Sequence, residues 1–454
     1  MTLLLVQMLL AAIGAVALYT FIGFVPGTDE TSVLAPVTLA LVLGGVAPEV
    51  VLTFFISAVV TLNLMNAIPT ALVGLPGGVM SAPLMEHSLK LRRAGLASTT
   101  IRKMAVGSLI GTVVSIPLSF AISAALAPIA APLKAQAPLL LAAGAVLLAL
   151  LGHNRILALL SIVPLALLFQ ALPLLYKSIG VIPHEKTISI SFFLGITVGP
   201  MLITLLGLLN QQRRTELTRA GDAVVQLPRR QMAPTLRPSR IVTKGEGLWS
   251  AGLAAASTPL FFLSPVGITF LLGELSAKRR GTDIQRSERA VTVMSALTHS
   301  TYLAGVIIPL VALGIPLSGV SAGPAGPLFV APPVLRIGHN LHDLLTPWQM
   351  VLAVTLGAVL ALAVTYFIAV RWSAQITEFV MRHVPHEAVL SLFIAFILLL
   401  AYIDAGIMNL FGVLLIGLVC GTLNRMGVNY GVQFMTLYAS AWIVPELGHL
   451  LALG

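Results

Sequence analysis

Apolar stretches of about 18–22 residues recur along the whole chain, and each is long enough to cross a hydrocarbon core of about 30 Å. Clear examples lie at 3–22, 104–126, 188–209 and 350–370. Together with less regular stretches, they predict roughly 10–12 membrane crossings. Because these runs are unbroken rather than alternating, they favour helices over the strands of an outer-membrane barrel. We therefore expect an all-α, polytopic membrane protein.

Composition supports a membrane location. Of the 454 residues, 57% are hydrophobic and only 9% are charged, whereas a soluble domain carries roughly 25% charged residues. So few charges cannot cover the surface of a water-soluble globule. The first apolar stretch has no basic flank and no small-residue cleavage site, so we expect a retained helix rather than a signal peptide. The expected location is the bacterial cytoplasmic (inner) membrane.

The net charge of +10 indicates orientation rather than a ligand. Lys and Arg gather in the cytoplasmic loops of membrane proteins, so no nucleic-acid partner is expected. The single cysteine, Cys420, lies inside an apolar run. This excludes a disulfide framework and a cysteine-based metal site, and we expect Cys420 to be a core residue.

One long polar stretch, 210–247, divides the chain. It holds eight of the 26 basic residues, three acids and three prolines, and the prolines disfavour a continuous helix. We interpret it as a basic cytoplasmic linker between an N-terminal membrane repeat at 1–209 and a C-terminal membrane repeat at 248–454. A lipid-binding or regulatory role for the linker is the alternative.

The two halves share a motif rich in proline and glycine. Residues 68–83 read IPTALVGLPGGVMSAP, and residues 308–323 read IPLVALGIPLSGVSAG. Gly27 and Gly267 match at the same offset of 240 residues. Two matches at one offset indicate an internal duplication. Within the motif, the coinciding pairs are Ile68/Ile308, Pro69/Pro309, Gly74/Gly314, Pro76/Pro316, Ser81/Ser321 and Ala82/Ala322.

Basic residues flank the two motifs on opposite sides. The first motif is followed by a basic stretch at 90–103, whereas the second is preceded by one at 278–289. If basic loops are cytoplasmic, the halves have opposite orientations in the membrane. This is the inverted-repeat plan of many secondary transporters.

Helices broken by Pro and Gly at membrane depth expose backbone groups that are costly in lipid. Such breaks persist where they are packed in protein or line a wet cavity, and there they offer helix ends to anions and carbonyls to cations. Proline kinks and tight helix crossings are the alternative for any single proline. For the duplicated motif, we favour a site. The expected substrate-binding residues are Asn66, Thr70, Gly74, Pro76, Gly77, Gly78, Ser81, His299, Ser300, Gly314, Pro316, Ser318 and Ser321, and the expected ion-coupling residues are Pro26, Gly27, Thr28, Asp29, Gly267 and Thr269.

Polar residues near these breaks are further candidates, because they are costly in a membrane. Asp29 and the following Glu30 are expected either to bind a coupling cation or proton, or to cap a helix in the headgroup region. Asn63 and Asn66, three residues apart on one helical face, either line a cavity or bond between helices. His299 is either a proton relay or a packing residue.

Two segments carry a resemblance to a known family. The stretch GFVPGTDETSVLAPVTLAL followed by MNAIPTALVGLPGGVMSAPLMEHSLKLRRAGLASTTIRKMAVGSLIGTV, together with VIIPLVALGIPLSGVSAGPAGPLF, resembles the large membrane permease of the tripartite tricarboxylate transporters. The resemblance implies import of carboxylates with a small membrane subunit and a periplasmic or lipoprotein binding protein. It also implies an ion gradient as the energy source, and this chain has no G-x-x-x-x-G-K-[ST] loop.

The sequence departs from that family's pattern near the breaks. His87 and Ser88 stand where the family tends to have Asp-Gly, and Leu317 follows the proline where the family has Gly. Ala296 replaces a typical Glu, and His299-Ser300 replaces paired Asn. The resemblance therefore supports the architecture and transport more strongly than a citrate-like substrate.

These observations predict the large permease subunit of a secondary-active transporter for a small organic anion, expected to be a carboxylate. Na⁺ or H⁺ is the expected coupling ion, and no other cofactor is expected. A translocase for a lipid-linked anion such as polyprenyl phosphate is the alternative, and an assembly subunit without a pathway is a third. Asp404 lies between two apolar runs and is expected in a loop. No Ser/His/Asp arrangement or metal-ligand spacing stands out in the sequence, and we therefore predict no enzymatic activity.

Overall fold

The chain is helical in all its main elements. The computed structural model describes residues 2–25, 30–73, 77–183, 189–207, 209–210, 236–278, 281–384 and 386–452. Within these ranges the only β-type pairing is two isolated bridges, at 331–335 and 336–339. The prediction of an all-α protein is confirmed.

Nine helices in the described ranges are long and apolar enough to cross a membrane. Three shorter apolar helices add to them, so the observed set approaches the predicted number. The long helices are α1 (Thr2–Gly23), α3 (Pro48–Leu72), α5 (Ala97–Leu126), α8 (Arg155–Ser178), α9 (Ser189–Gly207), α14 (Asp283–Ile308), α17 (Pro347–Arg371), α19 (His386–Ala405) and α20 (Ile407–Arg425). The short ones are α2 (Glu30–Leu43), α7 (Ala137–Leu151) and α13 (Pro265–Ala277).

Two of the long helices are enclosed by protein. The most apolar 18-residue windows of α3 and α14 are 100% and 94% buried, whereas that of α1 is 28% buried. A helix covered by protein on every side can carry polar residues that lipid would not tolerate. Accordingly, α3 and α14 carry Asn, Ser, Thr and His side chains, while α1 is almost wholly apolar.

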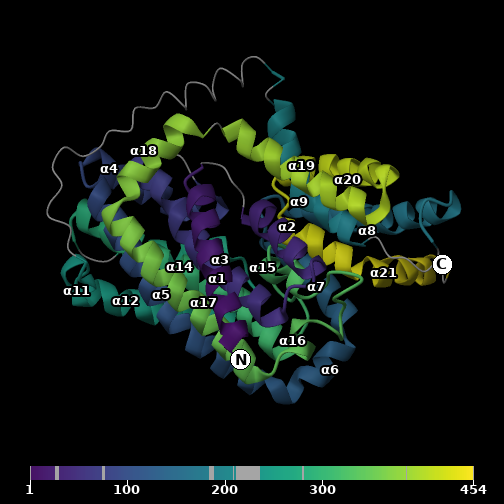
Figure 1. Cartoon of the computed structure of the whole chain (residues 1–454), viewed down its shortest axis with the longest axis horizontal. Helices are drawn as coiled ribbons and strands as arrows, with labels where there is room; N and C mark the ends of the chain where they lie inside the picture. The colour runs from purple at the N-terminus through teal and green to yellow at the C-terminus, as the bar shows by residue number, and fades with distance from the viewer. Residues whose placement is uncertain are drawn as a thin grey trace.

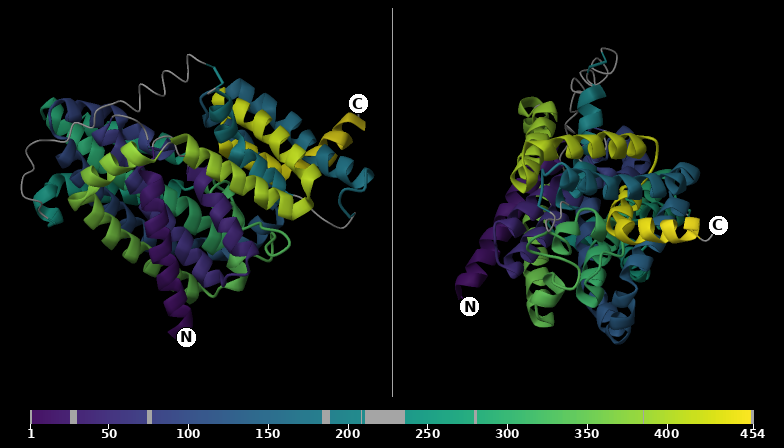
Figure 2. Two further views of the ribbon diagram at one scale, coloured as in Figure 1. Left: turned by 45° about the horizontal axis from the view of Figure 1, so that its top comes forward. Right: turned by 90° about the vertical axis from the view of Figure 1, so that its right-hand side faces the viewer.

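The helices form two bundles (Figure 1). The first bundle contains α1, α3, α5, α14, α17 and α12 (Lys244–Ser257), and the second contains α7, α8, α9, α19, α20 and α21 (Tyr430–Ala452). Figure 2 shows the second bundle set to one side of the first. The second bundle has a hydrophobic core of its own, which includes Phe169, Phe192 and Phe434.

The contacts of the two halves correspond. In the first bundle, α3 contacts α1 and α17. At the offset of 240 residues, α14 corresponds to α3, α12 to α1 and α17 to α5, and α14 contacts α12 and α5. In the second bundle, α7 and α8 contact α21, and α19 and α20 contact α9. Each bundle therefore contains helices of both halves, and α9 and α21 are exchanged between them. The inverted orientation of the halves stays a prediction.

The predicted linker is described only at its ends. Residues 211–235 lie outside the described residues. The short helix α11 (Pro238–Ile241) and the first turn of α12 occupy the C-terminal part of the predicted range. In α12, Thr243 caps the helix by accepting a hydrogen bond from the Glu246 backbone N–H, as a capping box does.

Candidate functional site

The first Pro/Gly motif interrupts the helical path after α3. That helix ends at Leu72 and the short 3-10 helix η1 (Val79–Leu84) follows. Gly74 and Pro76 lie outside the described residues, as do Pro26, Gly27, Thr28 and Asp29 of the predicted ion-coupling set. The broken geometry predicted for this motif is therefore observed at its two described ends.

Two glycines let the chain press against α3 at this break. A Cβ on Gly77 would lie 2.1 Å from the Asn66 carbonyl oxygen. A Cβ on Gly78 would lie 2.4 Å from both Asn66 Nδ2 and Glu30 Oε1. The contact at Gly77 is with backbone, so no side chain fits there and glycine is needed for close approach. At Gly78 a side chain would displace the Asn66 and Glu30 side chains. Asn66, Gly77 and Gly78, predicted as site residues, therefore lie together.

A buried carboxylate joins the same group. Glu30, the first residue of α2, is 3% exposed. Its carboxylate accepts hydrogen bonds from Asn66 Nδ2 and from the backbone N–H groups of Val79 and Met80, each at 3.2 Å. Sequence reasoning raised Glu30 as a cation ligand or a headgroup cap. The structure makes it the acceptor that holds η1 against α2 and α3.

Two amides of α3 retain polar atoms without hydrogen-bond partners. Asn63 is 4% exposed and Asn66 is 0% exposed. Asn63 Nδ2 and Asn66 Oδ1 have no hydrogen-bond partner. Buried unsatisfied atoms are rare in native proteins and call for a water, an ion or a ligand. Thr70, one turn further along α3, is also fully buried.

The second motif breaks α14 in a related way. The helix continues as one π-helical turn, η4 (Pro309–Leu313), and ends at Gly314, which has a left-handed φ of 62°. The chain then passes through the buried Pro316 to Ser318, which caps the short helix α15 (Gly319–Ala322). Gly314 is required by its positive φ.

One hydrogen-bond pattern recurs in both motifs at the offset of 240 residues. The Gly78 N–H donates to Ser81 Oγ at 3.1 Å, and this hydroxyl donates back to the Gly78 carbonyl at 2.7 Å. The Ser318 N–H likewise donates to Ser321 Oγ at 2.8 Å, with a return bond of 3.1 Å. The repeated sequence therefore adopts the same local structure twice.

Later segments satisfy carbonyls that the broken helices leave exposed. The guanidinium of Arg92 donates to the carbonyl of Val73, at the end of α3. In the other half, Asn340 Nδ2 donates to the Gly314 carbonyl at 2.8 Å, and His342 Nδ1 lies 3.0 Å from the Leu310 carbonyl. Such bonds satisfy carbonyl groups that have no partner within a helix at a helix end.

His299 and Ser300 bond between helices rather than with the broken motifs. His299 Nε2 lies 2.8 Å from Ser108 Oγ of α5 and 3.3 Å from the Val60 carbonyl of α3, and its Nδ1 lies 3.0 Å from the Ser295 carbonyl. Ser300 Oγ lies 2.9 Å from Ser257 Oγ. Of the two roles considered for His299, these contacts favour that of a packing residue.

The two predicted ion-coupling residues within the described ranges lie on α13. The Gly267 N–H donates to the Ser264 hydroxyl at the start of that helix. Thr269 is fully buried, and its hydroxyl has no hydrogen-bond partner. Helix α14 contacts α13, η1 and α15, so it connects this region with both motifs.

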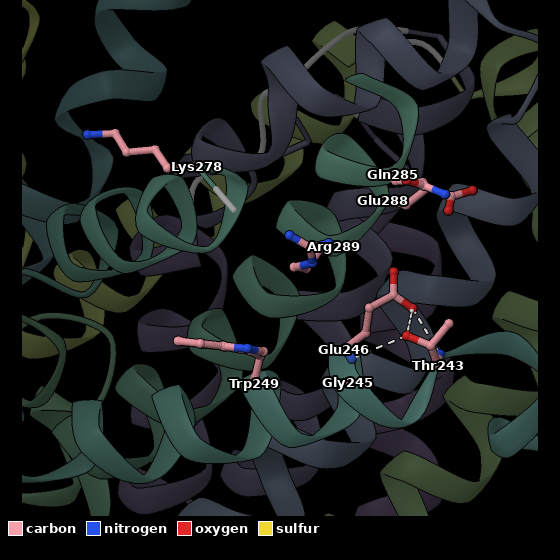
Figure 3. Close-up of a pocket in the computed structure, with 8 residues that line it drawn as sticks. All are labelled: Thr243, Gly245, Glu246, Trp249, Lys278, Gln285, Glu288 and Arg289. Carbon is pink, nitrogen blue, oxygen red and sulfur yellow. Dashed lines mark hydrogen bonds between the residues drawn. The ribbon is translucent and has the colours of Figure 1, made fainter. Parts of the chain in front are cut away.

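A buried charge cluster lies where the first half meets the second. Lys103 Nζ of α5 is 2.7 Å from Glu246 Oε1 of α12 and 3.3 Å from Glu288 Oε2 of α14. The two carboxylates line an open cavity of about 770 Å³ (Figure 3). In Figure 3, Glu246 bonds to Thr243, and Arg289 of α14 lines the same cavity.

A second cavity of about 590 Å³ lies next to α4 (Met85–Arg93). Here His87 Nε2 is 3.0 Å from Glu274 Oε1, and His87 Nδ1 is 3.2 Å from Ser287 Oγ. These three side chains come from α4, α13 and α14. They link the halves at the level of the basic segments.

Sequence reasoning missed both of these polar clusters. It assigned Lys103 to a basic loop, whereas the lysine is buried within α5. The expectation that Asp404 lies in a loop is wrong, because it lies in the last turn of α19 and accepts a hydrogen bond from Ser191. Lys103 and the basic residues before it directly precede an apolar run. Either a loop or the first turns of a helix can occupy such a position, so the sequence does not distinguish them.

A family model described as the tripartite tricarboxylate transporter TctA family matches residues 9–432. No curated protein and no solved structure matches the chain.

Proposed function

Because the chain belongs to the tripartite tricarboxylate transporter TctA family, we propose that it is the large permease subunit for a small organic anion, a carboxylate. In this proposal, a Na⁺ or H⁺ gradient across the bacterial inner membrane drives secondary-active uptake. A small membrane subunit and a periplasmic or lipoprotein binding protein are the proposed partners. The family is a family of transporters, which agrees with the prediction of a protein that is not an enzyme.

The observation that carries the proposal is the pair of matching breaks in buried helices. Each break presents a serine hydroxyl, Ser81 or Ser321, and non-helical backbone in a region covered by protein. Helix ends and unwound backbone of this kind bind substrates and ions in transporters with broken helices. The buried amides of Asn63 and Asn66 add polar atoms without protein partners beside the first break.

We assign the substrate contacts to the two motifs. In the first half these are Asn66, Thr70 and the glycines of 74–78, with Pro76 and Ser81. In the second half they are Gly314, Pro316, Ser318 and Ser321. His299 and Ser300 take a supporting role in this assignment, because their hydrogen bonds join α14 to α5, α3 and α12. The coupling ion is assigned to the region around 26–30 and to Gly267 and Thr269.

Counterflow in proteoliposomes tests the transport class. Liposomes containing the full chain together with the proposed small membrane subunit and binding protein are loaded with an unlabelled mono-, di- or tricarboxylate and exposed to the same compound labelled with ¹⁴C. We expect trans-stimulated uptake of at least one carboxylate class. The double variant Ser81→Ala/Ser321→Ala is expected to lower it about tenfold or more, and Gly14→Ala, at a position with open space around it, is the matched control.

Two outcomes would contradict the proposal. Absence of counterflow for all three carboxylate classes would exclude a soluble carboxylate as the substrate. Transfer of a fluorescent polyprenyl phosphate between leaflets in the same liposomes, without carboxylate counterflow, would instead favour the lipid-linked anion as substrate.

A further inference from the structure

The first broken motif places a buried carboxylate next to a buried carbonyl oxygen without a hydrogen-bond partner. Glu30 is 3% exposed and Asn66 is 0% exposed. Asn66 Nδ2 lies 3.2 Å from Glu30 Oε1, and Asn66 Oδ1 has no hydrogen-bond partner. Native structures seldom leave such an atom unsatisfied, and a bound ion can satisfy it.

The chemistry of the pair determines which amide atom faces which way. A charged carboxylate only accepts hydrogen bonds, so the amide atom of Asn66 that lies 3.2 Å from Glu30 is its NH₂ nitrogen, and the carbonyl oxygen of the same amide is the atom left without a hydrogen-bond partner. Carboxylate and amide oxygens are the ligands that hard cations prefer. We propose that Glu30 and Asn66 form a binding site for a monovalent cation beside the first broken motif.

The surrounding backbone holds the proposed site in place. The N–H groups of Val79 and Met80 each donate to the Glu30 carboxylate at 3.2 Å, which fixes the orientation of its two oxygens. Gly78 lies against the same pair, and a Cβ there would lie 2.4 Å from both Asn66 Nδ2 and Glu30 Oε1. Without a side chain on Gly78, the carboxylate and the amide remain in contact.

The second half carries no counterpart of this pair. At the offset of 240 residues, Phe270 corresponds to Glu30 and Val306 corresponds to Asn66. The serine bond of the motif, in contrast, is present in both halves. The serine hydrogen bond is therefore common to both halves, whereas at these matched positions only the first half has side chains with oxygen ligands.

The cation site deepens the proposed function, and it rests on that function for its role in coupling. Asn63 lies one helical turn before Asn66, is 4% exposed, and has an NH₂ nitrogen without a hydrogen-bond partner. An amide NH₂ is a donor for a carboxylate. Side chains at i and i+3 on a helix are about 5–6 Å apart at Cβ. A cation and an anion this close attract each other, and we expect each to raise the affinity of the other by about 5- to 150-fold.

Cation-dependent stability tests the site without any knowledge of the substrate. The full chain in detergent is unfolded by heat while tryptophan fluorescence is followed. NaCl is titrated against choline chloride at constant ionic strength and pH 8, and a pH series from 5 to 8 is run in choline chloride. We expect the unfolding midpoint to rise with the logarithm of the Na⁺ concentration. A response to pH with no response to Na⁺ would identify the bound cation as a proton.

Three variants separate a cation site from a structural hydrogen bond. Glu30→Gln is expected to abolish the cation response, and Glu246→Gln, which changes another buried carboxylate, is expected to keep it. Asn66→Asp adds a negative charge beside Glu30, so this variant is expected to be less stable in choline and to gain more from Na⁺ than the wild type. Because it retains an oxygen ligand, Asn66→Asp remains informative if Glu30→Gln does not fold.

Two results would overturn the proposed cation site. If Glu30→Gln and Asn66→Asp show the same dependence on Na⁺ and pH as the wild type, Glu30 and Asn66 do not bind the cation. A lack of any Na⁺ or pH response in the wild type would have the same meaning. If the Na⁺ response is present but no carboxylate supports counterflow, the cation site stands and the proposed substrate falls.

Discussion

Replacing Lys103 by methionine should strongly destabilise the protein. The Lys103 side chain is 5% exposed and contacts two carboxylates, those of Glu246 at 2.7 Å and Glu288 at 3.3 Å. Glu246 is 8% exposed and Glu288 is 21% exposed. The substitution keeps most of the apolar stem but leaves both carboxylates without their shared cation.

The magnitude follows from the burial of the cluster. Breaking a buried ion pair by removing one partner costs about 3–5 kcal/mol, because the remaining charge stays buried and uncompensated. An exposed pair contributes about 0–1 kcal/mol. Lys90 and Glu86 form such a pair at 2.6 Å, with 53% and 64% of their side chains exposed. Lys103→Met should therefore cost several times more than the control substitution Lys90→Met.

Reversible unfolding in mixed detergent micelles, followed by tryptophan fluorescence, measures these free energies. The triple variant Lys103→Met/Glu246→Gln/Glu288→Gln is expected to recover most of the lost stability, because no charge remains buried. A Lys103→Met variant within about 1 kcal/mol of the wild type would refute the reasoning. A triple variant that is as unstable as the single one would show that packing, rather than charge, is responsible.

Further substitutions test the break geometry and the pH dependence of stability. Gly77→Ala would place a Cβ 2.1 Å from a backbone carbonyl and should cost about 1–3 kcal/mol or more; Gly14→Ala, with open space around it, should instead stabilise by about 0.5–1 kcal/mol, and equal midpoints in thermal unfolding would contradict this. Ser321→Ala leaves a buried N–H without its acceptor and should cost about 1–3 kcal/mol in the same assay, with an unchanged midpoint as the contrary result. Burial lowers the pKa of His342, and the nearby charge of Lys134 lowers it further. The unfolded state therefore binds a proton at a higher pH than the folded state does, and stability should fall as the pH drops below about 6.5. His342→Gln should flatten that part of the pH profile, and an unaltered acid limb would exclude His342 as its source.

The helices were predictable because lipid imposes a simple rule on length and polarity. The apolar runs at 104–126 and 350–370 lie within α5 and α17, since a membrane helix needs about 20 apolar residues. Their N-terminal ends were less predictable. Helix α5 begins at Ala97, and its first turns contain charged residues that look like a loop until their buried partners are known.

The broken motif was predictable as a motif, but its contacts were not. Pro and Gly at matching positions indicated a repeated break, and the serine bonds at Ser81 and Ser321 lie within that local pattern. The contact between Glu30 and Asn66 joins residues that are 36 positions apart. Lys103 and Glu246 are 143 positions apart. Local propensity carries no information about such pairs, because tertiary packing creates them.

The exchange of helices between the halves bears on how this protein moves. Rocking of one half against the other would require α9 to leave its groove on α20, where a Cβ on Gly421 would lie 2.4 Å from the Gly199 carbonyl oxygen. Such close backbone packing at small residues is typical of tightly associated helices in membranes. The two bundles, each built from both halves, are therefore better candidates for rigid units. Helix α2 contacts α3 in one bundle and α9 in the other, and α15 contacts α14 and α21. The segments next to both breaks thus lie between the bundles, where relative movement would change their exposure.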